Sequence, residues 1–234
     1  MRRVLSRLIP APWRAAFRER FGGRTYGRLA YSQEGEDLVL QRIFDAQPDG
    51  IYVDVGAHHP FRFSNTCLLH KRGWRGINID AMPGSMALFQ RFRPSDVNLE
   101  VGVGVEPCVL DFHLFREPAL NTFDGALAEE RRALGWPLVR TVQVPCMPLS
   151  EILSRHLPTL GASTIDLLTI DVEGVDFDVL RSNDWNQFRP RALLVEILDQ
   201  DLSSVTHSPI YEYCMAMGYH AFAKLNHSVI FLRR

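Results

Sequence analysis

Several acidic residues stand at the ends of short apolar runs in the sequence, where they could act on one ligand together. Asp80, Asp171 and Glu196 each end or follow such a run, and Gly56 follows another. Carboxylates accept hydrogen bonds from sugar hydroxyls, attract cations, bind metal ions and take protons from reacting groups. A glycine lets the backbone turn tightly and approach a ligand closely. These residue types predict a site for a ligand that carries hydroxyl groups and positive charge.

The elements that must position these residues alternate between helix and strand from Tyr31 onward. Apolar and β-branched runs predict parallel strands at 51–55, 76–80, 98–103, 165–170 and 191–197. Helices are expected between them, including one capped by Ser32 and one over 83–92. Strands at 219–224 and 228–232 flank a short turn, so the last strand is antiparallel. We expect an α/β fold with one mostly parallel sheet and helices on both faces.

In such a sheet, ligands bind outside the carboxyl ends of the strands. The residues expected there are Asp54, Gly56, Ala57, His58, His59, Asp80, Ala81, Gly102, Gly104, Asp171, Glu173 and Glu196. Asp80 ends the second strand, where its carboxylate can accept two hydrogen bonds from ribose hydroxyls. Together with Gly56 it predicts an adenosine-binding site. One of the two histidines is expected to be structural and the other to face the reacting group as a base, and the sequence leaves open which.

Charge distinguishes the two main classes of adenosine cofactor. A nicotinamide cofactor needs a G-x-G-x-x-G turn for its pyrophosphate, but Gly56 is followed by histidine, proline, phenylalanine and arginine instead. Acids dominate the expected cleft: Glu34, Glu36, Asp37, Asp54, Asp80, Asp171, Glu173 and Glu196. S-adenosylmethionine carries a sulfonium and an ammonium group and no phosphate, so carboxylates favour it.

The composition is ordinary for a globular enzyme. The chain has 234 residues, 46% of them hydrophobic and 23% charged, with a net charge of -1, which argues against nucleic acid as a partner. Four widely spaced cysteines are expected to be reduced. No run of about 18 apolar residues could span a membrane, and no secretory signal is evident, so we expect a cytoplasmic protein.

Positive charge is concentrated at the start of the chain. Residues 1–30 carry eight arginines and one acid, Glu19. Apolar residues recur between the arginines at helix-like intervals, which is compatible with docking on the protein's own domain or with peripheral contact with an anionic membrane. We therefore expect two parts: a basic N-terminal extension over 1–30 and an enzymatic domain over 31–234.

Five short motifs, in this order, resemble those of the FkbM family of S-adenosylmethionine-dependent methyltransferases. The resemblance implies a class I methyltransferase fold, which is Rossmann-like, and O-methylation of a hydroxyl on a sugar, glycan or polyketide-type small molecule. It covers about residues 31–232. The motifs are YSQEGED (31–37), YVDVGAH (52–58), SNT (64–66), GWRGINID (73–80) and IDVEG (170–174).

The resemblance also implies roles for individual residues. Asp54, Gly56 and Ala57 would line the methionine part of the cofactor, and Asp80, followed by Ala81, would hold its ribose. Further cofactor contacts are expected from Gln33, Glu36, Asp37, Ser64, Asn65, Thr66 and Asp171.

Removal of the acceptor proton needs a base or a metal ion. The candidates are Asp171, Glu173, Glu196, His58 and His59. A divalent metal is possible here but not expected, because only two acids are well placed at neighbouring strand ends. Asp176 is expected to face solvent.

Two other functions stay open at this point, a nicotinamide-dependent sugar oxidoreductase and a catalytically inactive cofactor-binding module. The polar segment 116–139 interrupts the alternation beyond the third strand and is expected to help form the acceptor site. The acceptor's identity and the oligomeric state do not follow from the sequence.

Overall fold

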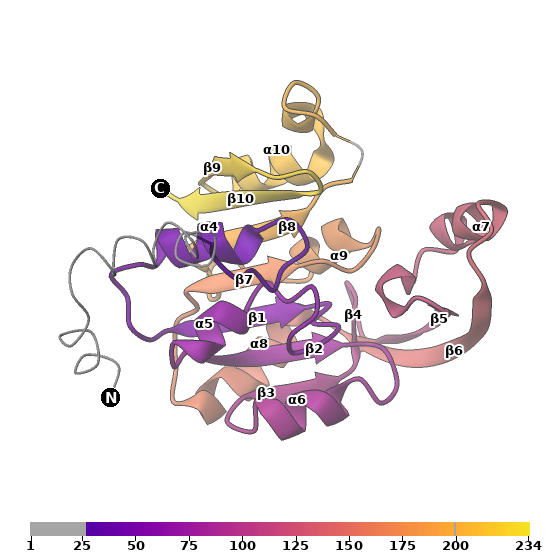
Figure 1. Ribbon diagram of the computed structural model, residues 1–234, viewed down its shortest axis with the longest axis horizontal. Coiled ribbons are helices and arrows are strands. Elements are labelled where there is room, and N and C mark those ends of the chain that lie inside the picture. The colour runs from indigo at the N-terminus through magenta and orange to yellow at the C-terminus, as the bar shows by residue number, and fades with distance from the viewer. Residues whose placement is uncertain (1–26, 199) are drawn as a thin grey trace, which may run out of the picture. The chain divides into compact units, whose positions relative to one another are not determined.

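A seven-stranded sheet forms the centre of the structure, with the strand order β3-β2-β1-β7-β8-β10-β9. The computed structural model describes residues 27–198 and 200–234 (Figure 1). The strands are β1 (Ile51–Val55), β2 (Arg75–Asp80), β3 (Val97–Glu100), β7 (Leu167–Ile170), β8 (Ala192–Glu196), β9 (Tyr219–Lys224) and β10 (Ser228–Arg233). Strands β3, β2, β1, β7 and β8 are parallel, and β10 is antiparallel to both of its neighbours. The predicted fold class is confirmed.

The strand order reverses between β1 and β7. From β1 the chain moves outward through β2 to β3, and it then returns to place β7 on the other side of β1. At such a switch point the connections leave the sheet in opposite directions, which opens a crevice at the carboxyl ends of the strands. The fold therefore predicts a ligand site beyond the ends of β1 and β7.

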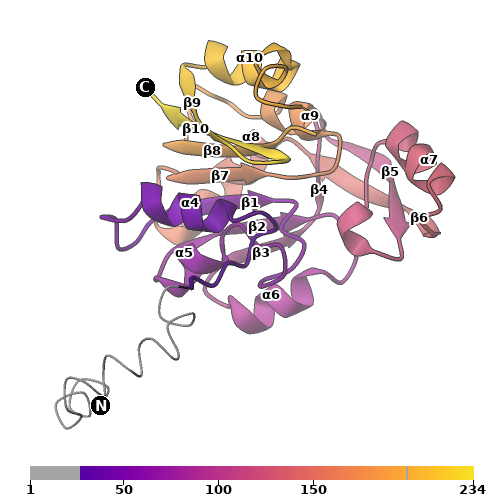
Figure 2. The ribbon, with the colours of Figure 1, turned by 45° about the horizontal axis from the view of Figure 1, so that its top comes forward.

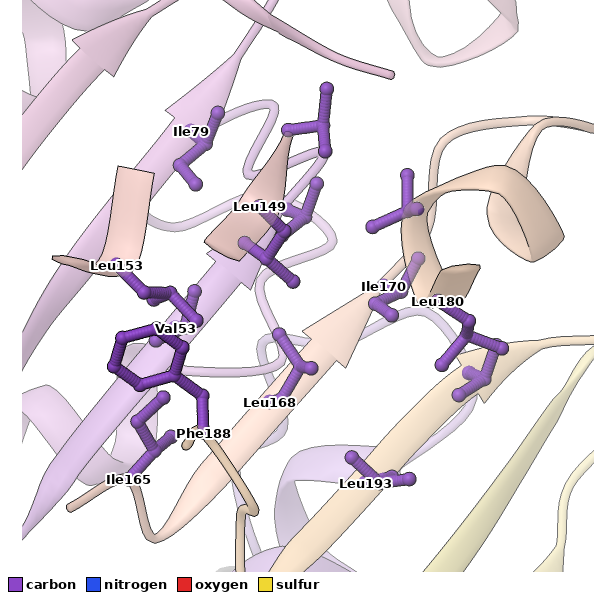
Figure 3. Close-up of a cluster of buried hydrophobic side chains, with 14 of the residues drawn as sticks. Val53, Ile79, Leu149, Leu153, Ile165, Leu168, Ile170, Leu180, Phe188 and Leu193 are labelled. Atoms are coloured by element: carbon purple, nitrogen blue, oxygen red, sulfur yellow. The ribbon is translucent and has the colours of Figure 1, made fainter. Parts of the chain in front are cut away.

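Both faces of the sheet are covered by helices (Figure 2). Alternate strand residues point to opposite faces, so Val53 and Leu168 belong to one core and Tyr52 and Leu167 to the other. Figure 3 shows the larger core, which includes residues of α8, α9 and α10; α4 and α5 contribute to the smaller one. The helices are α4 (Glu36–Ile43), α5 (Cys67–Lys71), α6 (Met86–Phe92), α7 (Gly125–Ala133), α8 (Leu149–His156), α9 (Asp176–Arg181) and α10 (Pro209–Ala216).

Two helices begin later than predicted. Helix α4 begins at Glu36. Gly35, in a left-handed conformation with a φ of 92°, is its N-cap residue. The Ser32 hydroxyl instead accepts hydrogen bonds from the backbone N–H groups of Gly35 and Asp37, each at 3.2 Å. Helix α6 begins at Met86 rather than at Pro83.

A second, three-stranded sheet was not predicted. It contains β4 (Gly102–Val103), β6 (Leu138–Met147) and β5 (Cys108–Phe115), in that order. The predicted strand over 98–103 is thus divided between two sheets, with β3 in one and β4 in the other. In Figure 1 the arrowheads of β1, β2 and β7 point toward the side where β5 and β6 lie.

The segment 116–139 is more regular than predicted. It contains a short 3-10 helix (Pro118–Leu120), the helix α7 and the start of β6. Asp124 caps α7, since its side chain accepts hydrogen bonds from Ala126 N and Leu127 N at 2.8 and 3.1 Å. Good helix formers follow this cap in the sequence.

The Cα packing separates Met1–Ala30 from Tyr31–Arg234. The expected amphipathic segment, and its proposed contact with a membrane, fall on residues 1–26 and lie outside the described residues. Across residues 27–198 and 200–234, no helix is both long and apolar enough to cross a bilayer. The four cysteines are free, as predicted.

Candidate active site

A cavity of about 790 Å³, including its opening to solvent, lies at the carboxyl ends of the parallel strands. We call it the main cavity. The residues that line it are Gln33, Val55, Gly56, His58, Phe63, Ile79, Asp80, Ala81, Met82, Val101, Gly102, Val103, Phe112, Pro118, Ala119, Asn121, Phe123, Asp171, Val172, Glu173 and Val175.

The main cavity runs across four neighbouring strand ends. Val101 follows β3, Asp80 ends β2, Gly56 follows β1 and Asp171 follows β7. Parallel strands lie about 4.8 Å apart, so three spacings cover roughly 14 Å. The cavity is therefore long enough for an extended ligand, with an apolar end near Val101 and an acidic end near Asp171.

Gly56 is required by the close approach of two loops. Its φ is 82°, and a Cβ at this position would overlap the carbonyl oxygen of Asp171. The Gly56 and Ala57 N–H groups both donate to the Ile79 carbonyl at 3.0 Å. The loop after β1 is thus held against the ends of β2 and β7. Only glycine, which has no Cβ, permits this close approach.

Asp80 is fixed by backbone hydrogen bonds and still has accepting capacity. Its Oδ2 accepts from His58 N and its Oδ1 from Met82 N, both at 2.8 Å. A carboxylate has about four lone-pair sites, so one on each oxygen is left for a ligand. Burial raises the pKa of Asp80, and the two backbone N–H groups partly offset this. The predicted ribose contact is compatible with this geometry.

The structure separates the roles of the two histidines. His59 Nδ1 accepts from Phe61 N and Arg62 N, both at 3.0 Å, and so holds the turn after β1. His58 lines the main cavity. Burial, together with the charge of Arg62, lowers the pKa of His58 to about 4. His58 is therefore neutral at physiological pH, and it is the histidine that can contact a ligand.

Backbone strain is concentrated at the cavity wall. Within the described residues, the non-glycine residues with positive φ are His58 at 53°, Phe63 at 56° and Glu173 at 57°. Such conformations cost about 1–3 kcal/mol each and often occur at ligand sites. All three residues line the main cavity.

A smaller cavity of about 300 Å³ adjoins the main one. We call it the side cavity; it shares Gln33, Phe63 and Asp171 with the main cavity. Its other lining residues are Glu34, Glu36, Asn65, Glu196, His227 and Ser228. It lies beyond the ends of β7 and β8 and is strongly acidic, with His227 contacting Glu34 at 2.8 Å.

Three predicted catalytic acids meet between the two cavities. One carboxylate oxygen each of Asp171, Glu173 and Glu196 lie within 4.8 Å of one another. Arg131 forms an ion pair with Glu173, whereas Glu196 Oε2 is buried with no hydrogen-bond partner among the described residues. Burial first, and then the neighbouring carboxylates, raises the pKa of Asp171 and of Glu196 well above the ordinary values.

Asp176 organises the loop that carries two of these acids. Its Oδ1 accepts from Val172 N and its Oδ2 from Gly174 N, both at 3.2 Å. Asp176 is 4% exposed, so the expectation that it faces solvent is wrong. Because it is the first residue of α9, its carboxylate can turn back to the loop N–H groups.

A buried arginine engages several of the predicted methionine-binding residues. Arg93 is 1% exposed and donates to Thr66 Oγ1 at 2.8 Å, to Ser64 Oγ at 2.9 Å and to Pro60 O at 2.7 Å. Thr66 in turn donates to Asp54 Oδ2 at 2.6 Å. None of Asp54, Ser64 and Thr66 lines either cavity. The geometry thus gives them a part in holding the loop between β1 and α5.

The other predicted cofactor residues are divided between the cavities and the core. Ala81 lines the main cavity, Asn65 and Glu36 line the side cavity, and Gln33 lines both. Ala57 is buried against Met86 and Phe89 instead. Asp37 is fully buried and accepts from Tyr31 N at 2.6 Å.

The segment 116–139 supplies one wall of the main cavity. Pro118, Ala119, Asn121 and Phe123 line it. Asn121 Oδ1 accepts from Phe115 N at 2.8 Å. The expectation that this segment forms the acceptor site stays a prediction.

Sequence reasoning missed Arg93 and Phe63. The signal for Arg93 was weak, since a single arginine after a predicted helix is usually a solvated residue. Its Nη1 and Nη2 atoms make five hydrogen bonds, which form only when β1, β2 and the loop around Pro60 come together. No sequence pattern indicated Phe63, because its left-handed conformation depends on the fold of the loop around Pro60.

Comparison with known proteins gives one family match. The family described as Methyltransferase FkbM domain matches residues 54–221. Among solved structures, a candidate RNA methyltransferase from Pyrococcus horikoshii is similar with a TM-score of 0.40 and 10% identity, over 85% of this chain and 83% of that one. A search of curated proteins finds no match.

Proposed function

The chain belongs to the FkbM methyltransferase domain family, and from this premise we propose that it is an S-adenosylmethionine-dependent O-methyltransferase. The proposed acceptor is a hydroxyl group of a sugar, a glycan or a polyketide-type small molecule. The observation that carries the proposal is the pair of adjoining cavities, which share the carboxylate of Asp171. Family membership favours methyl transfer over a nicotinamide-dependent oxidation.

The main cavity suits S-adenosylmethionine. Asp80 has two lone pairs available for ribose hydroxyls, and Gly56 allows the loop after β1 to pack closely against Asp171 at the cavity wall. The apolar end of the cavity, with Met82, Val101 and Phe112, suits the adenine ring. Toward the other end, the Asp171 carboxylate suits the cationic part of the cofactor because carboxylates attract a sulfonium and an ammonium group, and the Gln33 amide oxygen can accept a hydrogen bond from the ammonium group.

The side cavity suits the acceptor. Its polar groups, which include Asn65, Glu196 and Ser228, can exchange hydrogen bonds with hydroxyl groups. It opens onto Asp171, which also lines the main cavity. An acceptor in the side cavity would therefore present a hydroxyl next to the cofactor.

When bound, S-adenosylmethionine supplies a methyl group on a positively charged sulfur. Held beside Gly56, Asp80 and Asp171, it would pass this methyl group to the acceptor oxygen and keep the electron pair of the C–S bond on sulfur, and the Asp171 carboxylate would take the hydroxyl proton. Asp171 is a stronger base than an exposed aspartate, because burial raises its pKa. The protein's main contribution is alignment, which can supply about 7–11 kcal/mol.

The test is a transfer assay with a labelled methyl group. The purified chain is incubated with methyl-deuterated S-adenosylmethionine and a panel of sugars, glycans and polyketide-type alcohols, and the products are analysed by mass spectrometry. We expect the label on an oxygen atom of an acceptor. Calorimetry is expected to show binding of S-adenosylhomocysteine and none of NADH. Label on nitrogen or carbon, or binding of NADH alone, would contradict the proposal.

A further inference from the structure

We propose that Asp171, Glu173 and Glu196 bind a hard divalent cation of the magnesium, calcium or manganese type at the junction of the two cavities. The cation would hold the acceptor oxygen beside the methyl donor. The role of the cation in holding the acceptor rests on the proposed function, whereas the binding of the cation does not.

The geometry of the three carboxylates fits one cation. Their oxygens lie within 4.8 Å of one another. Oxygens around one such ion, at metal–oxygen distances of about 2.1–2.5 Å, lie roughly 3–5 Å apart. Small side-chain rotations are enough to bring all three onto one ion. Hard oxygen ligands of this kind favour magnesium, calcium or manganese over zinc.

Glu196 provides an independent sign that the cluster of three acids binds a ligand. The residue is 7% exposed, and its Oε2 is buried without a hydrogen-bond partner in the described residues. A buried carboxylate oxygen with no partner is costly, by about 1–3 kcal/mol or more. Glu196 lines the side cavity, and one of its carboxylate oxygens lies within 4.8 Å of an oxygen of Asp171 and of Glu173. A cation at this point would satisfy it.

The charge balance also favours a cation. Among the described residues, the three acids form one ion pair, between Glu173 and Arg131. Further acids, among them Asp176 and Glu36, add to the negative potential at Asp171. Asp176 is occupied by two backbone N–H groups, so it supports the loop of Asp171 and Glu173 rather than acting as a ligand.

A cation at this junction would act on the acceptor directly. Asp171 lines both cavities and Glu196 lines the side cavity. With a cation bound, Asp171 is a ligand of the ion rather than the base: a hydroxyl bound to a divalent cation has a lowered pKa, so it loses its proton to water more easily. The resulting oxygen then forms the bond to the methyl carbon, and the electron pair of the C–S bond stays on sulfur.

The test measures cation binding without any reaction. The full chain is stripped with chelator and titrated with Mn²⁺, and the free ion is followed by electron paramagnetic resonance. We expect one bound Mn²⁺ that excess Mg²⁺ or Ca²⁺ displaces. Glu196→Gln and Asp171→Asn are each expected to weaken binding at least tenfold. Asp178→Asn, an exposed acid on α9, serves as the control and is expected to bind as the parent does.

Three outcomes would overturn the cation site. They are no Mn²⁺ bound by the parent at millimolar concentration, unchanged binding by Glu196→Gln, or an equal loss of binding in Asp178→Asn. Thermal melting of each variant shows that the fold is retained. If Glu196→Gln does not fold, Asp171→Asn decides the question by the same criterion.

A separate assay distinguishes this proposal from the proposed function. If the chelated protein transfers the methyl group as fast as the Mg²⁺-loaded protein, the cation's role in acceptor activation is overturned and the proposed function stands. If Mn²⁺ binds as expected but no hydroxyl acceptor is methylated, the cation site is supported and the proposed function fails.

Discussion

At the scale of single residues, Asp80 is the most direct test of cofactor binding. Its carboxylate accepts two backbone hydrogen bonds and retains two lone pairs toward the main cavity. We predict that Asp80→Ala lowers the affinity for S-adenosylhomocysteine by about 1–2 kcal/mol, because the ribose hydroxyls lose their acceptor. Calorimetry measures the change.

The matched control for Asp80 is Asp111→Ala, which removes an exposed acid from β5. It is expected to leave the affinity unchanged. Melting curves verify that the fold survives the loss of the carboxylate that accepts from His58 N and Met82 N. Equal affinity in the parent and in Asp80→Ala would refute the ribose contact.

His58 gives a prediction about pH. Burial lowers its pKa to about 4 from an ordinary value of 6.5, so the folded protein keeps the ring neutral where the unfolded chain protonates it. The unfolded state thus binds more protons between about pH 6.5 and 4. The contribution of His58 to stability is fully present above this window and is lost as the pH falls through it.

The measurement for His58 is a pH titration of the imidazole resonances by NMR. We expect its carbon-bound protons to keep their neutral-form shifts from pH 7 to about pH 5. His58→Ala assigns the signals. A midpoint near 6.5 would show that the ring is not buried as the structure indicates.

At the scale of elements, the loop between β1 and α5 depends on the residue that follows α6. Arg93 links Pro60 and Ser64 of this loop to Tyr52 on β1 and Asn78 on β2. We predict that Arg93→Met destabilises the fold by about 3–5 kcal/mol, since it removes the positive charge that offsets the buried Asp54 carboxylate and leaves Ser64 and Thr66 without their donor. Denaturant unfolding measures this loss.

Arg91→Met is the control for Arg93. It removes an exposed arginine from α6 and is expected to change stability by less than about 0.5 kcal/mol. If both variants unfold at the same denaturant concentration as the parent, the Arg93 network contributes nothing to the loop.

At the scale of the whole molecule, residues 31–234 form one compact unit by Cα packing, and within residues 27–198 and 200–234 the buried hydrophobic clusters begin at Leu40. We predict that a chain of residues 31–234 folds, melts within a few degrees of the full chain and binds S-adenosylhomocysteine equally well. Thermal melting and calorimetry test this. A loss of binding would show that residues 1–30 take part in the site.

The same pair of chains tests the proposed membrane contact. Residues 1–30 carry eight arginines and one acid, so we expect the full chain to sediment with anionic lipid vesicles and the 31–234 chain to remain in solution. Neutral vesicles are the control. Equal sedimentation of both chains would show that residues 1–30 are not responsible for binding to the vesicles.

The sequence by itself determined the order along the chain of the strands of the seven-stranded sheet and the acids at their ends. Period-2 apolar runs, the glycine after β1 and the hairpin at the C-terminus act over a few residues, so their effect can be predicted locally. This is why 51–55 and 219–224 were predicted with the bounds that the structure has. The motifs also identified the family, which the match over residues 54–221 confirms.

Only the tertiary structure decided which of those residues meet. The division of 98–103 between two sheets depends on β6, which lies some 40 residues later in the chain. The burial of Asp176, the separate roles of His58 and His59 and the convergence of Glu173 with Glu196 likewise depend on loops that are distant in sequence. Hydrogen-bond partners and charges from distant segments set these properties, and local sequence patterns carry no record of them.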